Sequence, residues 1–209
     1  MGCTSSSHAH VLPLQPVAPP VAVLDPAFVS TLPVSFYLQE NLRLLHGDLF
    51  VVQDRVSGVP YLQIKCQGAM FQHKHVFFDT MGTVVAIMEE PLVLFKQRRD
   101  VLKSDLTTWF YVTPGRCCGV SSLDCVAIDA TSGEPRVFAL HGQWRTHDAV
   151  FLCDDVPIAH VGCPQECSRG RYCVDVAAGV DVALIALLCV CMDEFMLFRG
   201  TVIHGALVL

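Results

Sequence analysis

Charged residues are scarce in this chain of 209 residues: Lys, Arg, Asp and Glu make up 16% of it, and the net charge at pH 7 is −6. Globular domains carry about 25% charged residues, and disordered chains combine low hydrophobicity with high net charge. Because 52% of the residues are apolar, the composition excludes a disordered chain and predicts a domain with a sizeable core. The acidic balance also disfavours nucleic acid as a direct partner.

The usual catalytic and nucleotide-binding signatures are missing as well. The sequence contains no G-x-S-x-G, H-E-x-x-H, P-loop or G-x-G-x-x-G pattern. We therefore expect no catalytic residue, no bound metal, no cofactor and a protein that is not an enzyme.

No Lys or Arg precedes Arg43, so the N-terminal segment lacks the basic region of a secretory signal or transit peptide. The eleven cysteines are an odd number in a chain that is long and apolar enough to fold without disulfides. We interpret the thiols as reduced and the protein as cytosolic in orientation.

The first six residues fit the M-G-x-x-x-[ST] pattern, in which Gly2 accepts a myristoyl chain, and Cys3 beside it is a palmitoylation candidate. A single myristoyl chain binds a bilayer only marginally, with a constant of about 10⁴ M⁻¹, so stable anchoring needs a second signal. Because no basic patch is near, Cys3 has to supply that signal. We predict lipidation of Gly2 and Cys3 and a place on the cytoplasmic face of a membrane, with the plasma membrane expected. The alternative is an exposed start that matches the pattern by accident.

Six prolines between residues 8 and 35 favour extended or polyproline II backbone. We predict that residues 1–24 form a lipidated, flexible, proline-rich tether and that residues 25–209 form the folded domain. The PxxP spacings of Pro13, Pro16 and Pro19 leave open a role as a recognition motif.

Short apolar runs bounded by turn residues fill the chain from Gly47 to Ala177, which is typical of strands. In the run 61–66, Gln63 and Lys65 alternate with apolar residues, as they do in a strand with one wet face. No amphipathic helix interrupts the series, so we predict an antiparallel sheet that closes into a barrel. The predicted strands are 48–53, 61–66, 76–79, 83–88, 91–96, 107–113, 123–130, 135–140, 149–153, 157–161 and 171–177.

One segment differs from all the others: residues 182–192 are apolar without interruption. As a helix this run spans about 16 Å, half of the roughly 30 Å core of a bilayer. A helix that is apolar all round must be surrounded, so we predict a short helix at about residues 180–192 inside the barrel. A pair of central strands is the alternative. We expect Asp193 and Glu194 at the helix C-terminus to be offset by a cation such as Arg199.

Several blocks of the sequence together resemble a known family. They are residues 25–36 (DPAFVSTLPVSF), segments within 47–88 (FVVQDRVSGVPYLQIK and VFFDTMGTVVAIME), residues 142–161 (GQWRTHDAVFLCDDVPIAHV) and the helix VDVALIALLCVCMDE. Their order resembles the LURP-one-related branch of the tubby C-terminal-like superfamily, over residues 25 to 196. The resemblance implies a mainly β fold: a tubby-like closed antiparallel barrel of about twelve strands around a central hydrophobic C-terminal helix. It implies no catalytic mechanism.

The densest group of cations is Lys96, Arg98, Arg99 and Lys103. In tubby-like relatives, cations on the barrel bind phosphoinositide head groups, so the resemblance makes this group the candidate contact with anionic lipid. Each Lys or Arg near such a surface contributes about 1 kcal/mol. An ordinary charged hairpin is the alternative.

These observations predict a membrane-tethered, non-enzymatic signalling module that binds membrane lipids, phosphoinositides among them. The first alternative is lipid translocation, since the helix exit MDEFMLF is similar to the end of the phospholipid scramblases. Their acidic calcium-binding stretch is reduced here to Asp175 and Asp181, which disfavours calcium gating.

A weaker alternative is a redox or zinc protein that uses Cys163, Cys167 and Cys173, although their spacing is wider than structural zinc prefers. His73 and His75 share one face of a predicted strand, which we interpret as solvated.

Overall fold

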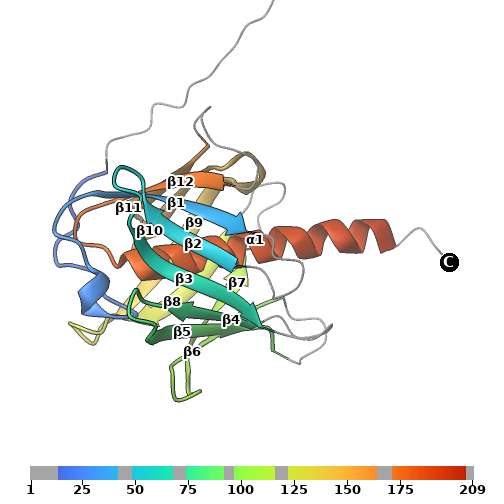
Figure 1. Ribbon diagram of the computed structural model, residues 1–209, viewed down its shortest axis with the longest axis horizontal. Helices are drawn as coiled ribbons and strands as arrows, with labels where there is room; N and C mark the ends of the chain where they lie inside the picture. Colours follow the sequence, from blue (N-terminus) through green and yellow to red (C-terminus); the bar gives the residue numbers. More distant parts are fainter. Residues whose placement is uncertain are drawn as a thin grey trace, which may run out of the picture.

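Twelve antiparallel strands close into a barrel around a single helix in the computed structural model, which describes residues 14–41, 49–67, 74–91, 97–115, 122–163 and 171–205. The helix, α1 (Val182–Gly205), runs through the barrel and leaves it at the far end (Figure 1). The predicted fold class is therefore confirmed.

Each strand pairs with the strands before and after it in the chain, and β1 closes the barrel against β12. The strands are β1 (Val34–Asn41), β2 (Leu49–Asp54), β3 (Pro60–Gln67), β4 (Lys74–Phe78), β5 (Val84–Glu89), β6 (Arg99–Leu102), β7 (Thr108–Pro114), β8 (Leu123–Ile128), β9 (Pro135–Gln143), β10 (Asp148–Cys153), β11 (Val156–Gly162) and β12 (Arg171–Val176). Short 3-10 turns, η1 (Pro26–Phe28) and η2 (Trp144–Thr146), precede β1 and β10.

Two strands differ from the predicted set. β1 lies within the predicted domain but is not among the predicted strands, which begin at residue 48, although Phe36 and Leu38 alternate into the core. β6 begins at Arg99, after the predicted strand 91–96, of which residues 92–96 lie outside the described residues. The sequence of β6, RDVL, is half charged, so its strand character depends on tertiary partners.

The core forms where the inward side chains of the strands meet α1. Every residue from Val182 to Met192 is buried, with Val182 the most exposed at 4%, so the helix fills the barrel and the alternative of a central strand pair is excluded. Burying one Leu, Ile, Val, Phe or Met side chain contributes about 1.5–3 kcal/mol, so this contact contributes strongly to stability. The helix continues to Gly205, well beyond the predicted end near residue 192.

The barrel has two different ends. The end where α1 begins carries the short connections 55–59, 79–83, 103–107, 129–134 and 154–155; we call it the hairpin end. The end where α1 leaves is called the exit end. At the hairpin end, Asp54 and Asp105 each accept a backbone N–H from a residue two positions on, which stabilises the turn. Hydrogen bonds from Ser57 lower the pKa of Asp54, and those from Thr107 lower the pKa of Asp105.

The N-terminal segment before β1 packs against the hairpin end (Figure 1). The backbone N–H of Val17 donates to Ala178 O at 2.9 Å, and that of Val21 donates to Gly179 O at 2.8 Å. Residues 21–24 are buried, with Val23 at 0% exposure. The packed domain therefore begins before residue 25, where the sequence placed the end of the tether, because these apolar residues cover the base of the barrel.

Candidate functional site

The four predicted lipid-contact cations do not form one surface patch. Lys96 lies outside the described residues. Arg98 precedes β6, Arg99 is its first residue, and Lys103 follows its end. Successive side chains in an extended segment point to opposite faces, so Arg99 faces the barrel interior while Arg98 faces outward.

Arg99 is 3% exposed and belongs to a buried ion pair. Its Nε and Nη2 donate to Oε2 of Glu194 on α1, at 3.3 and 3.0 Å. A guanidinium in this position is not available to a lipid head group. The surface role expected for Arg99 therefore fails, because Arg99 begins a strand and its side chain faces the interior of the barrel.

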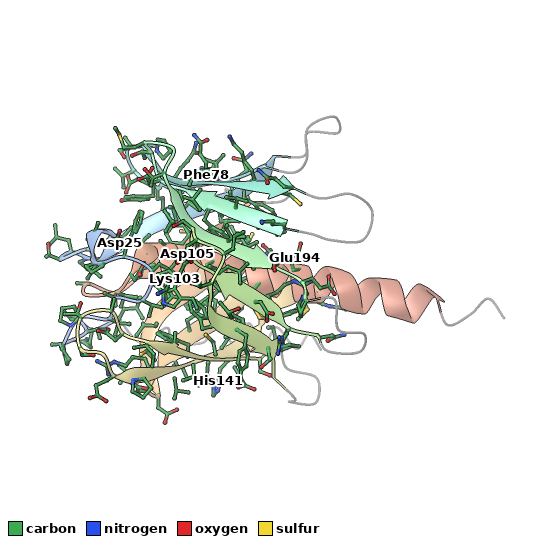
Figure 2. All side chains as sticks on the ribbon, turned by 90° about the horizontal axis from the view of Figure 1, so that it is seen from below. Asp25, Phe78, Lys103, Asp105, His141 and Glu194 are labelled. Atoms are coloured by element: carbon green, nitrogen blue, oxygen red, sulfur yellow. The ribbon has the colours of Figure 1, made fainter. Side chains whose placement is uncertain are left out.

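Three cations on the outer surface of β3–β7 each lie over an aromatic ring. The pairs, measured from the cation to the ring centroid, are Lys65 with Phe78 (5.0 Å), Arg98 with Tyr111 (5.5 Å) and Lys103 with Trp109 (5.3 Å). Figure 2 labels Phe78 and Lys103. A cation within about 6 Å of a ring centroid is attracted by the ring quadrupole. We call these the cation–aromatic pairs.

The pairs differ in how much charge they present. The Nε of Arg98 lies 2.8 Å from Oδ1 of Asp100, so its charge is largely matched. Lys65 and Lys103 are exposed and form no ion pair that involves a described residue. Lys65 was not among the cations predicted to contact lipid, although its position on the solvent-exposed face of a strand was predicted. Its contact with Phe78 could not be predicted, because it depends on the register of β3 with β4.

The outer surface between these pairs is apolar. Val76, Ile87 and Leu102 face outward on β4, β5 and β6 and form a cross-strand row, through the pairs Val76 with Ile87 and Ile87 with Leu102. They shelter one another, together with Phe78 and Val84, to 5–6% exposure. Lys side chains that extend along an apolar, aromatic surface with their charge in water are typical of membrane interfaces.

Polar residues of α1 hold the helix at the exit end. Asp193 accepts hydrogen bonds from Trp144 Nε1 and from Tyr172 OH, each at 2.8 Å. Glu194 pairs with Arg99, and its Oε1 lies 3.6 Å from Nε2 of His75. Burial raises the pKa of Tyr172 well above its ordinary value, and the Asp193 carboxylate adds to this shift.

Two expectations about this region need correction. Asp193 and Glu194 are inside α1 rather than at its C-terminus, and the described residues that pair with them belong to the barrel wall; the side chain of Arg199 is not among those described. His75 faces the interior and is 2% exposed, so its strand face is not solvated. His73 lies outside the described residues. Figure 2 shows Glu194 where α1 leaves the barrel, and Asp25 at the opposite end.

Asp181 joins the start of α1 to the N-terminal segment. Its Oδ1 accepts the N–H of Leu184, which caps the helix, and its Oδ2 accepts the N–H groups of Val23 and Leu24 at 3.1 and 2.7 Å. The carboxyl is fully buried. Burial raises its pKa, while the N–H donors act in the opposite direction. This acidic residue therefore has a structural role.

Comparison with known proteins identifies the family. The model of the LURP-one-related family matches residues 34–193, from the first residue of β1 to Asp193. The chain belongs to the LURP-one-related family. The family match thus ends at one of the two residues that hold α1 at the exit end.

An X-ray structure of an Arabidopsis thaliana protein has a fold similar to that of this LURP-one-related chain. The TM-score is 0.60 at 23% sequence identity, and the match covers 83% of this chain and 98% of that one. No curated protein matches. Within the described residues, no helix is long and apolar enough to cross a membrane.

The remaining predicted residues of this LURP-one-related chain lie partly outside the structure. The lipidation candidates Gly2 and Cys3 fall outside the described residues, as does Cys167. Cys163 is exposed, whereas Cys173 is buried. No group of three His, Cys, Asp or Glu that could hold a metal occurs among the residues the structure describes. Cys189 and Cys191 are fully buried, and burial raises the pKa of both thiols well above its ordinary value, as expected of core cysteines.

Proposed function

We propose that this LURP-one-related protein is a non-enzymatic, membrane-tethered module that binds anionic membrane lipids, phosphoinositides among them, and acts in signalling at the cytoplasmic face of a membrane. Acyl chains on Gly2 and Cys3 supply the tether. The barrel supplies the lipid contact through the cation–aromatic pairs, with Lys96 as a further contact.

The observation that carries the lipid contact is the placement of Lys65 and Lys103 over Phe78 and Trp109 on an apolar outer surface. The aromatic rings bury their apolar atoms at the level of the head groups, while the ammonium groups pair with phosphate. At about 1 kcal/mol for each cation, Lys65 and Lys103 together strengthen binding about 30-fold. A contribution of this size is enough to assist an acyl anchor.

The anchor is tested by imaging a protein tagged at its C-terminus. We expect Gly2→Ala to abolish stable membrane association and Cys3→Ser to leave only weak, reversible association, because one acyl chain is marginal. Membrane association that is unchanged in Gly2→Ala would rule out the acyl anchor.

The lipid contact is tested with the full chain made without acylation, by pelleting it with phosphatidylcholine vesicles that contain a phosphoinositide or phosphatidylserine. We expect Lys65→Ala/Lys103→Ala to lose most of the binding that depends on anionic lipid. Arg136→Ala/Arg145→Ala removes the same net charge from β9 and η2 and serves as the matched control. Equal losses of binding in the two variants would show that binding depends only on net charge, and would contradict a defined contact.

A further inference from the structure

A second part of the outer surface, on β7–β10, is apolar and open to solvent. We call it the β7–β10 face, made by the side chains of Tyr111, Val126, Ile128, Val137, Ala139 and Leu152. Tyr111 and Val126 are each 56% exposed, Val137 is 52% and Ile128 is 50% exposed. Ala139 and Leu152 are half-buried.

Strand register makes this face continuous. Val126 lies opposite Val137, and Ala139 lies opposite Leu152. Tyr111 precedes Val112, which pairs with Cys125, so Tyr111 lies beside Val126 on the same face. The residues between them, such as Cys125 and Phe138, point inward and are buried. An outward strand face is ordinarily polar, and a continuous exposed apolar patch indicates an interaction surface.

The few charges around the face do not form a binding site for a charged ligand. The exposed Asp124 lies opposite Ala139 and next to Val126, and Asp154, which is ion-paired with Arg136 at 2.9 Å, lies at the end of β10. At its β7 side, Tyr111 carries the Arg98 guanidinium, so the face continues into the cation–aromatic pairs. The centre is uncharged, and the cations lie on the side toward β6.

The N-terminal segment reaches the barrel beside this face. The N–H of Ala130, in the connection between β8 and β9, donates to Ala22 O at 2.6 Å. Ile128 and Pro135, which face each other at the ends of those strands, border the same connection. From residue 14, extended chain at about 3.1 Å per residue gives the thirteen preceding residues a reach of about 40 Å. Acyl chains at the start of the chain would therefore hold a bilayer within reach of the face.

We infer that the β7–β10 face docks onto the membrane, with its Val and Ile side chains at the boundary between head groups and acyl chains. This inference rests on the proposed membrane function and adds a contact that is apolar rather than ionic. The location of the N-terminal segment and the cation–aromatic pairs along the β7 side favour a bilayer over a protein partner as the occupant.

The test compares two triple variants of the unacylated full chain on vesicles of pure phosphatidylcholine at about 0.5 M NaCl, where the ionic contribution is screened. In the first, Val126→Thr/Ile128→Thr/Val137→Thr, β-branched residues are kept but apolar atoms are removed from the face. The matched control is Leu32→Thr/Val56→Thr/Val59→Thr, at residues that are 70%, 94% and 57% exposed elsewhere. Thermal unfolding confirms that both variants are folded.

We expect the wild-type chain and the control to bind these vesicles and the face variant to bind at least 10-fold more weakly. Equal binding by the two variants would overturn the inference. So would a face variant that changes only the oligomeric state in light scattering, since the face would then be an interface between copies of the chain.

The acyl tether and the docking face can be tested separately, because each fails in a different experiment. If acylated protein pellets with vesicles and unacylated wild type does not, the tether stands and the docking face is refuted. If the unacylated chain binds through the face but Gly2→Ala leaves cellular membrane association unchanged, the docking face stands and the acyl tether is refuted. If neither the acylated nor the unacylated chain binds any vesicle, both proposals fall.

Discussion

The two ends of the barrel hold the central helix by different means. At the hairpin end, one buried carboxylate, Asp181, accepts N–H groups from the helix start and from the N-terminal segment. At the exit end, two consecutive carboxylates, Asp193 and Glu194, contact side chains of the barrel wall. The first end depends on backbone N–H groups, including those of Val23 and Leu24 from the N-terminal segment, and the second on side chains of the barrel wall.

This difference shows where function is to be sought. Among the described residues, the polar side-chain contacts along the apolar run of α1 involve thiols, such as Cys191 with Met88. The carboxylates that fix the position of the helix lie at the two ends of the barrel. Arg99 was predicted to contact lipid, yet it pairs with Glu194 and holds the fold, as Asp181 does at the other end. The surfaces that we propose for binding lie on the outer faces of the strands.

The largest expected effect is at the exit end. Glu194→Ala leaves Arg99 buried without its main partner, and breaking a buried pair in this way costs about 3–5 kcal/mol. Urea unfolding measures the loss in the free energy of unfolding. Arg99→Met/Glu194→Leu, which removes both charges, should recover much of it. A double variant as unstable as Glu194→Ala would show that the pair contributes more than charge compensation.

At the hairpin end, Asp181→Ala should cost about 3 kcal/mol, because the helix cap is lost together with an acceptor for buried N–H groups of the N-terminal segment. Asp181→Asn retains one acceptor oxygen and should cost less. Proteolysis of the native protein gives a second readout: cleavage before residue 25 should increase in Asp181→Ala. Resistance equal to that of wild type would contradict the role of Asp181 in holding this segment.

A smaller loss of stability is expected at two turns, one of which also binds the N-terminal segment. Asp129 accepts N–H groups of its own turn and also the N–H of Ala22, whereas Asp105 accepts only from its own turn among the described residues. We expect Asp129→Ala to cost about 2 kcal/mol and Asp105→Ala to cost clearly less. Equal losses in thermal unfolding would mean that the contact with Ala22 contributes nothing.

The smallest effect depends on pH and belongs to the exit end. His147 stacks on Tyr172 at 4.4 Å, and burial lowers the pKa of His147 below its usual 6.5. Since the unfolded chain takes up this proton at a higher pH than the folded one, stability is complete above about pH 6.5 and falls as the pH drops below it. His147→Asn should therefore lose less stability than wild type between pH 7.5 and 5.5. Parallel curves for the two proteins would refute this contribution.

The sequence was sufficient for the architecture because the determining signals are local. Alternating runs such as 61–66 predicted strands, and the apolar run 182–192 predicted a surrounded helix. Two strands were not predicted from the sequence. β6 contains Arg99, whose partner Glu194 is 95 residues away, so the strand resembled a polar turn. β1 was missed because it directly follows the proline-rich stretch, whose prolines favour irregular extended backbone.

The site could be predicted only in part, for the same reason. A cluster of cations in sequence is not a cluster in space when strand alternation sends Arg99 inward. The pairing of Lys65 with Phe78 needs the register of β3 and β4, and the β7–β10 face needs the register of four strands. None of these registers can be read from composition or spacing.

The claim that the outer strand faces carry the function is tested most directly by fluorescence quenching in bilayers that contain brominated lipid. A tryptophan is placed at Val126 on the β7–β10 face or at the exposed Val56 in the connection between β2 and β3, in acylated protein that pellets with the vesicles. We expect brominated lipid to quench Val126→Trp strongly and to leave Val56→Trp little changed beyond the background of the native protein. Equal quenching at the two positions, or none at Val126→Trp in membrane-bound protein, would contradict the account.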